Sequence, residues 1–186
     1  FMLLNPMAET GKPISELVAD LRRYQTLADA TESALSLYPN QPVVYYFNGV
    51  ANSQLENHKA ATETLEMGKE MVIGNPGLKA QFFSLLGDSY NSLKLFQKSD
   101  EAFDQALYYD PENPYTLNNY SYYLSLRGER LSEAEKMSAK ANKLESNNAS
   151  FQDTYAWIMF KMGKYDEAKV WIEKAMASSN EDSAEI

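Results

Sequence analysis

The sequence of 186 residues contains no cysteine and a single histidine, His58. Without cysteine the chain can form no disulfide bond, thiolate metal site or thiol nucleophile. A metal site on a helix would need a second ligand three or four residues from His58, and there is none. A serine–histidine–acid triad would depend on the same residue, and no nucleophile-elbow sequence is present. The residues therefore predict a protein that is not an enzyme and holds no cofactor or metal.

Long apolar runs and basic clusters are also missing. No stretch approaches the roughly 20 apolar residues that span a bilayer. Asp and Glu number 26 against 17 Lys and Arg, a net charge of −9. This balance disfavours nucleic acid and anionic membranes, because both attract clustered positive charge. The chain begins at Phe1 without a signal-peptide pattern, and we interpret it as a piece of a longer protein that has lost any targeting segment.

What the sequence does contain is a residue pattern that recurs about every 34 residues. Large, small and large residues follow one another at fixed offsets in its clearest copy, which is Phe83, Leu86, Gly87, Tyr90, Ser99, Phe103, Ala106 and Pro111. A period in this range is the signature of a solenoid built from two-helix units. Such a chain offers extended surface and no dedicated reaction pocket, so the repeat favours binding over chemistry.

Clusters of Pro and Gly divide the chain into segments. We predict an irregular remnant (1–12), a partial helical repeat (13–41), four repeats (42–79, 80–113, 114–148, 149–178) and a flexible tail (179–186). Each repeat consists of a first (A) and a second (B) helix. Gly49 and Gly87 are 38 residues apart, which predicts about one extra helical turn in the first repeat.

Small residues at equivalent positions predict how the two helices of a pair pack. The A helices carry Gly49, Gly87, Ser121 and Ala156, and the B helices carry Ala61, Ser99, Ala134 and Ala168. We expect these positions to let each A helix approach its B helix closely, while larger side chains fill the gaps. No single pair buries enough to stand alone, so stability should come from stacking between neighbours.

This pattern resembles the tetratricopeptide repeat family. The second repeat matches nearly the full motif, whereas Asn52 stands in the first repeat where an aromatic residue is usual, and Ser146 replaces the closing Pro of the third. The resemblance implies an all-α, right-handed superhelical solenoid of antiparallel helix pairs, with about four full repeats plus an N-terminal partial repeat. It also implies a non-catalytic scaffold that binds proteins or peptides. Residues 118–123 and 153–157 are similar to bacterial members of Bacteroidetes type, which favours the cell envelope over the cytoplasm.

In the family, the inner curve is lined by A-helix side chains. Carried over, this set is Val43, Tyr46, Val50, Ser53, Gln81, Ser84, Asp88, Asn91, Tyr115, Asn118, Tyr122, Ser125, Ser150, Asp153, Trp157 and Phe160. Amides can hold an extended peptide backbone and aromatic rings can hold its side chains. The alternative is that the rings only pack against the next repeat. The resemblance to members that clamp carboxylates fails, because the groove set has no Lys and its Asp88 and Asp153 would repel a carboxylate. We therefore expect a neutral or basic peptide as partner.

Two further functions are open at this point. Val170, Trp171, Ile172 and Met176 predict an apolar C-terminal edge, because no clear polar capping helix follows them. The chain would then be a structural, self-assembling module. It could equally be a non-catalytic interaction region of a larger envelope or regulatory protein.

Overall fold

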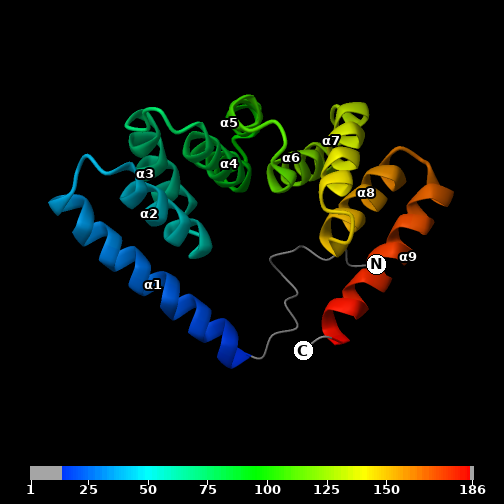
Figure 1. Ribbon diagram of the computed structural model, residues 1–186, viewed down its shortest axis with the longest axis horizontal. Helices are drawn as coiled ribbons and strands as arrows, with labels where there is room; N and C mark the ends of the chain where they lie inside the picture. The colour runs from blue at the N-terminus through cyan, green and yellow to red at the C-terminus, as the bar shows by residue number, and fades with distance from the viewer. Residues whose placement is uncertain (1–13, 185–186) are drawn as a thin grey trace. The chain divides into compact units, whose positions relative to one another are not determined.

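The computed structural model describes residues 14–184, with side chains from Val18 to Ser179, so the predicted remnant 1–12 lies outside the described residues. The regular elements of this part are all α-helices, as predicted (Figure 1). They are α1 (Ile14–Leu37), α2 (Pro42–Gln54), α3 (His58–Glu70), α4 (Pro76–Ser92), α5 (Phe96–Tyr109), α6 (Pro114–Arg127), α7 (Leu131–Leu144), α8 (Ala149–Lys161) and α9 (Tyr165–Ala184). The fold is a solenoid of helix pairs. The chain falls into two units, one up to Gln105 and one from Ala106.

In the first unit the predicted small-to-large contacts are present. Gly49 on α2 faces Leu65 of α3 so closely that an added Cβ would collide with its side chain. A Cβ on Gly87 would lie 2.8 Å from the Phe103 ring, and Ser99 Oγ donates a hydrogen bond of 2.8 Å to the Gly87 carbonyl oxygen. These glycines are therefore required by the close approach of neighbouring helices.

A further glycine, Gly68, has the same role and was not predicted from the repeat. It is buried on α3, where an added Cβ would collide with Tyr45 of α2 and Phe82 of α4. Phe82 is itself fully buried in the core of this unit. Gly68 thus lets one B helix pack against the A helices of two successive repeats, a contact that the pattern within one repeat does not reveal.

The N-terminal helix α1 packs on α2 through a polar contact. Asn48 is buried on α2 and donates a hydrogen bond of 3.0 Å to Thr31 Oγ1 of α1. Asn52, one turn later, donates to the carbonyl oxygen and to Oδ1 of Asn48, both at 3.0 Å. Asn52 stands where the repeat usually has an aromatic residue, and Thr31 is a buried residue of α1 that faces Asn48. Together with Asn48 they form the polar network between α1 and α2.

In the second unit, α6 packs on α7 and α8, and α8 on α7 and α9. Tyr120, Leu124, Ile158 and Met159 are fully buried. Two amides join successive repeats at the point where the closing Pro is missing. Asn142 Nδ2 donates to the Phe151 carbonyl oxygen at 2.9 Å, and Gln152 Nε2 donates to that of Ser146 at 2.7 Å.

The four turns between A and B helices share one backbone geometry. Glu56, Lys94, Gly128 and Gly163 all have positive φ, between 60° and 77°. In each turn, the N–H of the following residue bonds to the carbonyl five residues before it, as Glu129 does to Leu124 and Lys164 to Met159. This is the Schellman ending of a helix, in which glycine is preferred. Two of the four turns adopt it without glycine.

Two helix bounds differ from the prediction. Helix α4 begins at Pro76 rather than Ala80, because Asn75 Oδ1 caps its first turn by accepting a 3.0 Å hydrogen bond from Leu78 N. The predicted extra turn therefore lies at the start of α4. Helix α9 continues to Ala184 and does not end near Met176, so residues 179–184, predicted as a tail, are helical.

Candidate functional site

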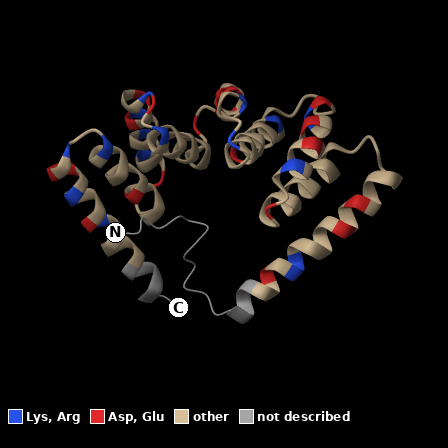
Figure 2. Cartoon of the chain, turned by 180° about the vertical axis from the view of Figure 1, so that it is seen from behind, with Lys and Arg blue, Asp and Glu red and all other residues tan. Residues whose placement is uncertain are grey.

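Charged residues are concentrated on the B helices (Figure 2). Helix α2 carries no Asp, Glu, Lys or Arg, and α4, α6 and α8 carry two, one and two. By contrast, α3, α5 and α7 carry five, four and five. The B helices thus present a well-solvated surface, while the A helices present amide, hydroxyl and aromatic groups. This difference marks the A helices as the surfaces suited to a partner.

In the first unit, the predicted groove residues are mostly half-buried. Tyr46 packs edge-on against Phe82, with ring centroids 5.5 Å apart, so its ring contacts the next repeat. Ser53 is buried, and only Val43 and Gln81 are well exposed. The remaining half-buried members are Val50, Ser84, Asp88 and Asn91.

In the second unit, the predicted residues form one surface over two neighbouring helices. Asn118 and Tyr122 are one turn apart on α6, Asp153 and Trp157 are one turn apart on α8, and α6 contacts α8. We call this surface the α6–α8 face. It consists of Tyr115, Asn118, Tyr122, Asp153, Trp157 and Phe160. Ser150 is exposed at the start of α8, whereas Ser125 is fully buried and donates a 2.6 Å hydrogen bond to the Tyr122 carbonyl oxygen.

The aromatic residues of the α6–α8 face contact other rings. Tyr115 lies edge-on to the buried Phe151 at 5.3 Å. Trp157 and Phe160 are stacked, with centroids 5.7 Å apart and planes 18° apart. Tyr115 and Phe160 nevertheless keep 58% and 51% of their surface exposed. Packing therefore holds these rings in place and leaves apolar surface accessible.

Three polar groups on the α6–α8 face lack a partner among the described residues. Asn118 Oδ1 and Trp157 Nε1 are buried without a hydrogen bond, and Asp153 makes no hydrogen bond or ion pair. Burial raises the pKa of the Asp153 carboxyl, and both burial and the Asp153 charge raise the pKa of Tyr122. Buried polar groups are normally satisfied, so the covered acceptor, the covered donor and the half-buried carboxylate are candidates for contact with a ligand.

The sequence did not predict a depression of about 470 Å³ in the first unit, between α3, α4 and α5. Most of its charged groups have partners: Glu66 accepts a 2.9 Å hydrogen bond from the Tyr90 hydroxyl and lies 2.7 Å from Lys69 Nζ. Lys98 Nζ lies 5.4 Å from the centre of the Tyr90 ring. Because Glu66, Lys69 and Lys98 interact with residues of the depression itself, we assign no ligand to it. The sequence signal for this depression is the pair of aromatic repeat positions Phe83 and Tyr90 on α4, with charged residues on the neighbouring helices α3 and α5.

The part of the chain that the structure describes contains neither a cluster of metal-ligating side chains nor a membrane-spanning helix. Within it no three His, Cys, Asp or Glu side chains come together in an arrangement that could bind a metal ion. His58, the first residue of α3, is half-buried in the turn after α2. None of the helices between residues 14 and 184 combines the length and the apolar character needed to cross a bilayer.

Comparisons with known proteins relate the chain to one repeat family. The sequence model of the tetratricopeptide repeat matches residues 80–113 and 150–182. A TPR repeat-containing protein of Pseudomonas aeruginosa, PA4667, is 26% identical over 183 residues, which cover 93% of this chain and 30% of the relative. The chain thus spans less than a third of the length of that curated relative. A Bacteroidetes-type origin stays a prediction.

Solved structures show the same architecture. The crystal structure of MamA aligns with a TM-score of 0.74 at 14% identity, covering 93% of this chain and 98% of that one. YrrB, described as a TPR protein with an unusual peptide-binding site, aligns with a TM-score of 0.66 at 16% identity over 88% and 81%. A thermophilic TPR protein of Thermus thermophilus, TTC0263, aligns with a TM-score of 0.71 at 19% identity over 92% and 91%. At these identities the likeness is one of fold.

Proposed function

We propose that this chain, which carries tetratricopeptide repeats at residues 80–113 and 150–182, is a non-catalytic scaffold that binds a protein or an extended peptide through its A helices. The bound segment is neutral or basic. In the second unit, the binding surface is the α6–α8 face.

The observation that carries this proposal is the set of unpartnered polar groups beside exposed aromatic surface. Asn118 Oδ1 and Trp157 Nε1 are covered in the unbound chain, and a change of side-chain rotamer on binding would let them accept from a peptide N–H and donate to a peptide carbonyl, respectively. Phe160 and Tyr115 offer apolar area next to them. A peptide would satisfy buried groups that cost free energy when left unpaired.

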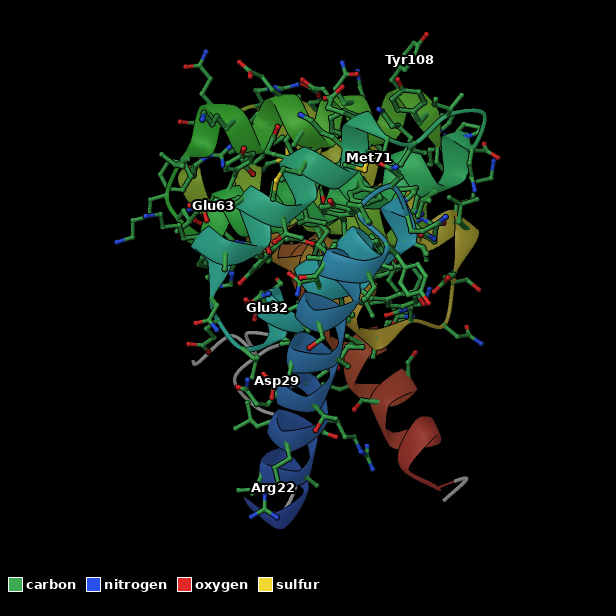
Figure 3. All side chains as sticks on the ribbon, turned by 90° about the vertical axis from the view of Figure 1, so that its left-hand side faces the viewer. Arg22, Asp29, Glu32, Glu63, Met71 and Tyr108 are labelled. Atoms are coloured by element: carbon green, nitrogen blue, oxygen red, sulfur yellow. The ribbon has the colours of Figure 1, made fainter. Side chains whose placement is uncertain are left out.

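The test is selection of peptides from a random display library on the intact chain, followed by affinity measurements on variants. We expect Asn118→Ala and Trp157→Ala to weaken binding of the selected peptides by about tenfold or more, as for central interface residues. The matched control is Tyr108→Ala, since Tyr108 is an aromatic residue that is 76% exposed on the B helix α5 (Figure 3). Equal affinity of the Trp157→Ala variant and the parent for every selected peptide would refute the proposal.

Self-association is the second candidate function, and a specific surface favours it. Val170 and Met176 are each 63% exposed on α9. The other two members of the predicted edge, Trp171 and Ile172, are half-buried, and Trp171 packs on Tyr155 with centroids 4.7 Å apart. The exposed apolar surface is thus narrower than predicted. A monomeric mass by light scattering at high concentration would exclude self-association of this chain.

A further inference from the structure

The A helices of the second unit carry few charges, and this makes the position of Asp153 unusual. Helix α8 has two charged residues, Asp153 in its first half and Lys161 at its end. They are eight residues apart, which places them about 12 Å apart along the helix axis. A carboxylate therefore lies on a surface that otherwise presents mostly neutral groups.

The basic side chains around α8 are engaged elsewhere. Lys161 Nζ lies over the Trp157 ring, 5.4 Å from its centre. Lys164 of the α8–α9 turn is paired with Glu135 of α7 at 2.7 Å, and Lys140 of α7 donates to the Pro111 carbonyl oxygen at 2.7 Å. Arg127 at the end of α6 is paired with Glu129 at 2.9 Å. None of these contacts involves Asp153, which has no cationic partner among the described residues.

A second acceptor lies on the same face. Asn118 is only 5% exposed, and its Oδ1 has no donor within the described part of the chain. It is one turn before Tyr122, whose hydroxyl is close enough to Asp153 for the carboxylate charge to raise its pKa. Asn118 and Tyr122 thus lie on the helix that contacts α8, and Tyr122 is near Asp153. Asn118 and Asp153 each carry an oxygen without a donor.

The chemistry of this spot selects for a positively charged donor. A partly desolvated carboxylate gains more from a cation than from a neutral N–H, because the cation also compensates for lost hydration. One carboxylate and one amide are too few for a metal ion, and no third acidic or histidine ligand joins them in the described residues. An ammonium or guanidinium group has several N–H donors and can serve both acceptors at once.

The neighbouring tryptophan has a different role. The Trp157 ring is stacked with Phe160, and the ammonium of Lys161 also lies over it. The group of Trp157 that lacks a partner is its Nε1–H donor. A donor one turn from Asp153 suits a backbone carbonyl near the cationic residue of a peptide.

We infer that the α6–α8 face contains a subsite for one lysine or arginine side chain of a bound peptide, with Asp153 and Asn118 as its acceptors and Trp157 Nε1 as the donor to the adjoining backbone. This inference rests on the proposed function, since it assigns the specificity of the same surface. The occupant is a side chain of a polypeptide and carries a single positive charge.

Labelled octapeptide pools that differ only at one fixed central residue (Lys, Arg, Gln, Leu or Glu) provide the test. Binding to the intact chain is measured by fluorescence polarisation. We expect the Lys and Arg pools to bind about tenfold more tightly than the Gln pool, which corresponds to about 1.4 kcal/mol, and the Glu pool to bind most weakly. Asp153→Asn should abolish the preference for Lys and Arg.

Two further variants complete the design. Glu63→Gln removes one carboxylate from the exposed surface of α3 (Figure 3) and should leave the preference intact. Asn118→Leu should weaken the Lys and Arg pools more than the Leu pool. Binding of all pools with equal affinity, or a preference that survives Asp153→Asn or is lost in Glu63→Gln, would overturn the subsite while the scaffold function stands. Failure of every pool to bind would overturn both.

Discussion

Asp153 is a residue whose ionisation should lower the stability of the folded chain. Its carboxyl has a pKa raised above 3.8 by burial and has no cation to compensate. A carboxyl with a raised pKa binds its proton more readily in the folded than in the unfolded state. Its contribution to stability is therefore full below about pH 3.8, the unfolded value, and is lost as the pH rises through the folded pKa.

We therefore predict that Asp153→Asn raises the melting temperature at about pH 7, since it removes the desolvated charge. The difference should shrink on acidification and disappear below the unfolded pKa of about 4, where both residues are neutral. Thermal unfolding by circular dichroism across this range is the measurement. Together with lost recognition of cationic peptides, a stabilised variant would identify Asp153 as a binding residue that costs stability. A lower melting temperature at neutral pH would contradict this role.

A second residue-scale prediction compares two glycines of α4. Gly87→Ala should lower the free energy of unfolding by about 1–3 kcal/mol, because its Cβ would lie 2.8 Å from three atoms of the Phe103 ring. Gly87→Leu should cost more. Gly77→Ala is the matched control: its Cβ would meet only Asn75 Oδ1 at 3.7 Å, so helix propensity should stabilise it by up to about 1 kcal/mol. Denaturant unfolding of both variants checks the pair, and equal effects would count against the close helix contact.

At the scale of elements, the A–B turns show what the sequence could and could not predict. Gly128 and Gly163 indicate helix ends in the sequence, because glycine readily adopts the positive φ that the Schellman ending needs. Glu56 and Lys94 also have positive φ, although neither residue type favours this conformation. The turn is set by the B helix folding back on its A helix.

Substitutions at equivalent positions of these turns should change the free energy of unfolding in opposite directions. Glu56→Gly and Lys94→Gly should each stabilise the chain by about 1 kcal/mol, because a side chain in the left-handed region costs about 1–2 kcal/mol. Gly128→Ala should destabilise it by a similar amount. Urea unfolding of the three variants measures this. A loss of stability in both glycine variants would show that their side chains make contacts that outweigh the backbone strain.

The polar contacts between elements were beyond sequence analysis. The repeat positions predicted that Asn118, Tyr122, Asp153 and Trp157 would share a face, since each pair is one turn apart on an A helix. They did not predict which polar groups lack partners, because that depends on the atoms of α6, α7 and α8 around them. Likewise, Asn52 looked like a defect in the aromatic position and is instead bonded to the Asn48 that holds α1.

At the scale of the whole molecule, the all-α class and the solenoid of helix pairs followed from the 34-residue period and the Pro and Gly breaks. Two helix bounds differ from the predicted segments. Helix α4 begins earlier because Asn75 caps its first turn, and α9 continues to Ala184. The distribution of charge over A and B helices was also in the sequence, and it becomes informative once the helix pairs are known (Figure 2). The partner remains a matter for binding experiments, for which the α6–α8 face supplies the expected contacts.

The indole N–H signals of Trp157 and Trp171 give the most direct test of that surface, because these are the chain's two tryptophans. A selected peptide is titrated into isotope-labelled chain and followed by nuclear magnetic resonance, with Trp157→Phe assigning the signals. The account predicts that the Trp157 Nε1–H resonance shifts with peptide concentration while that of Trp171, on α9, stays in place. A shift at Trp171 alone, or none at Trp157 under saturating peptide, would contradict binding at the α6–α8 face.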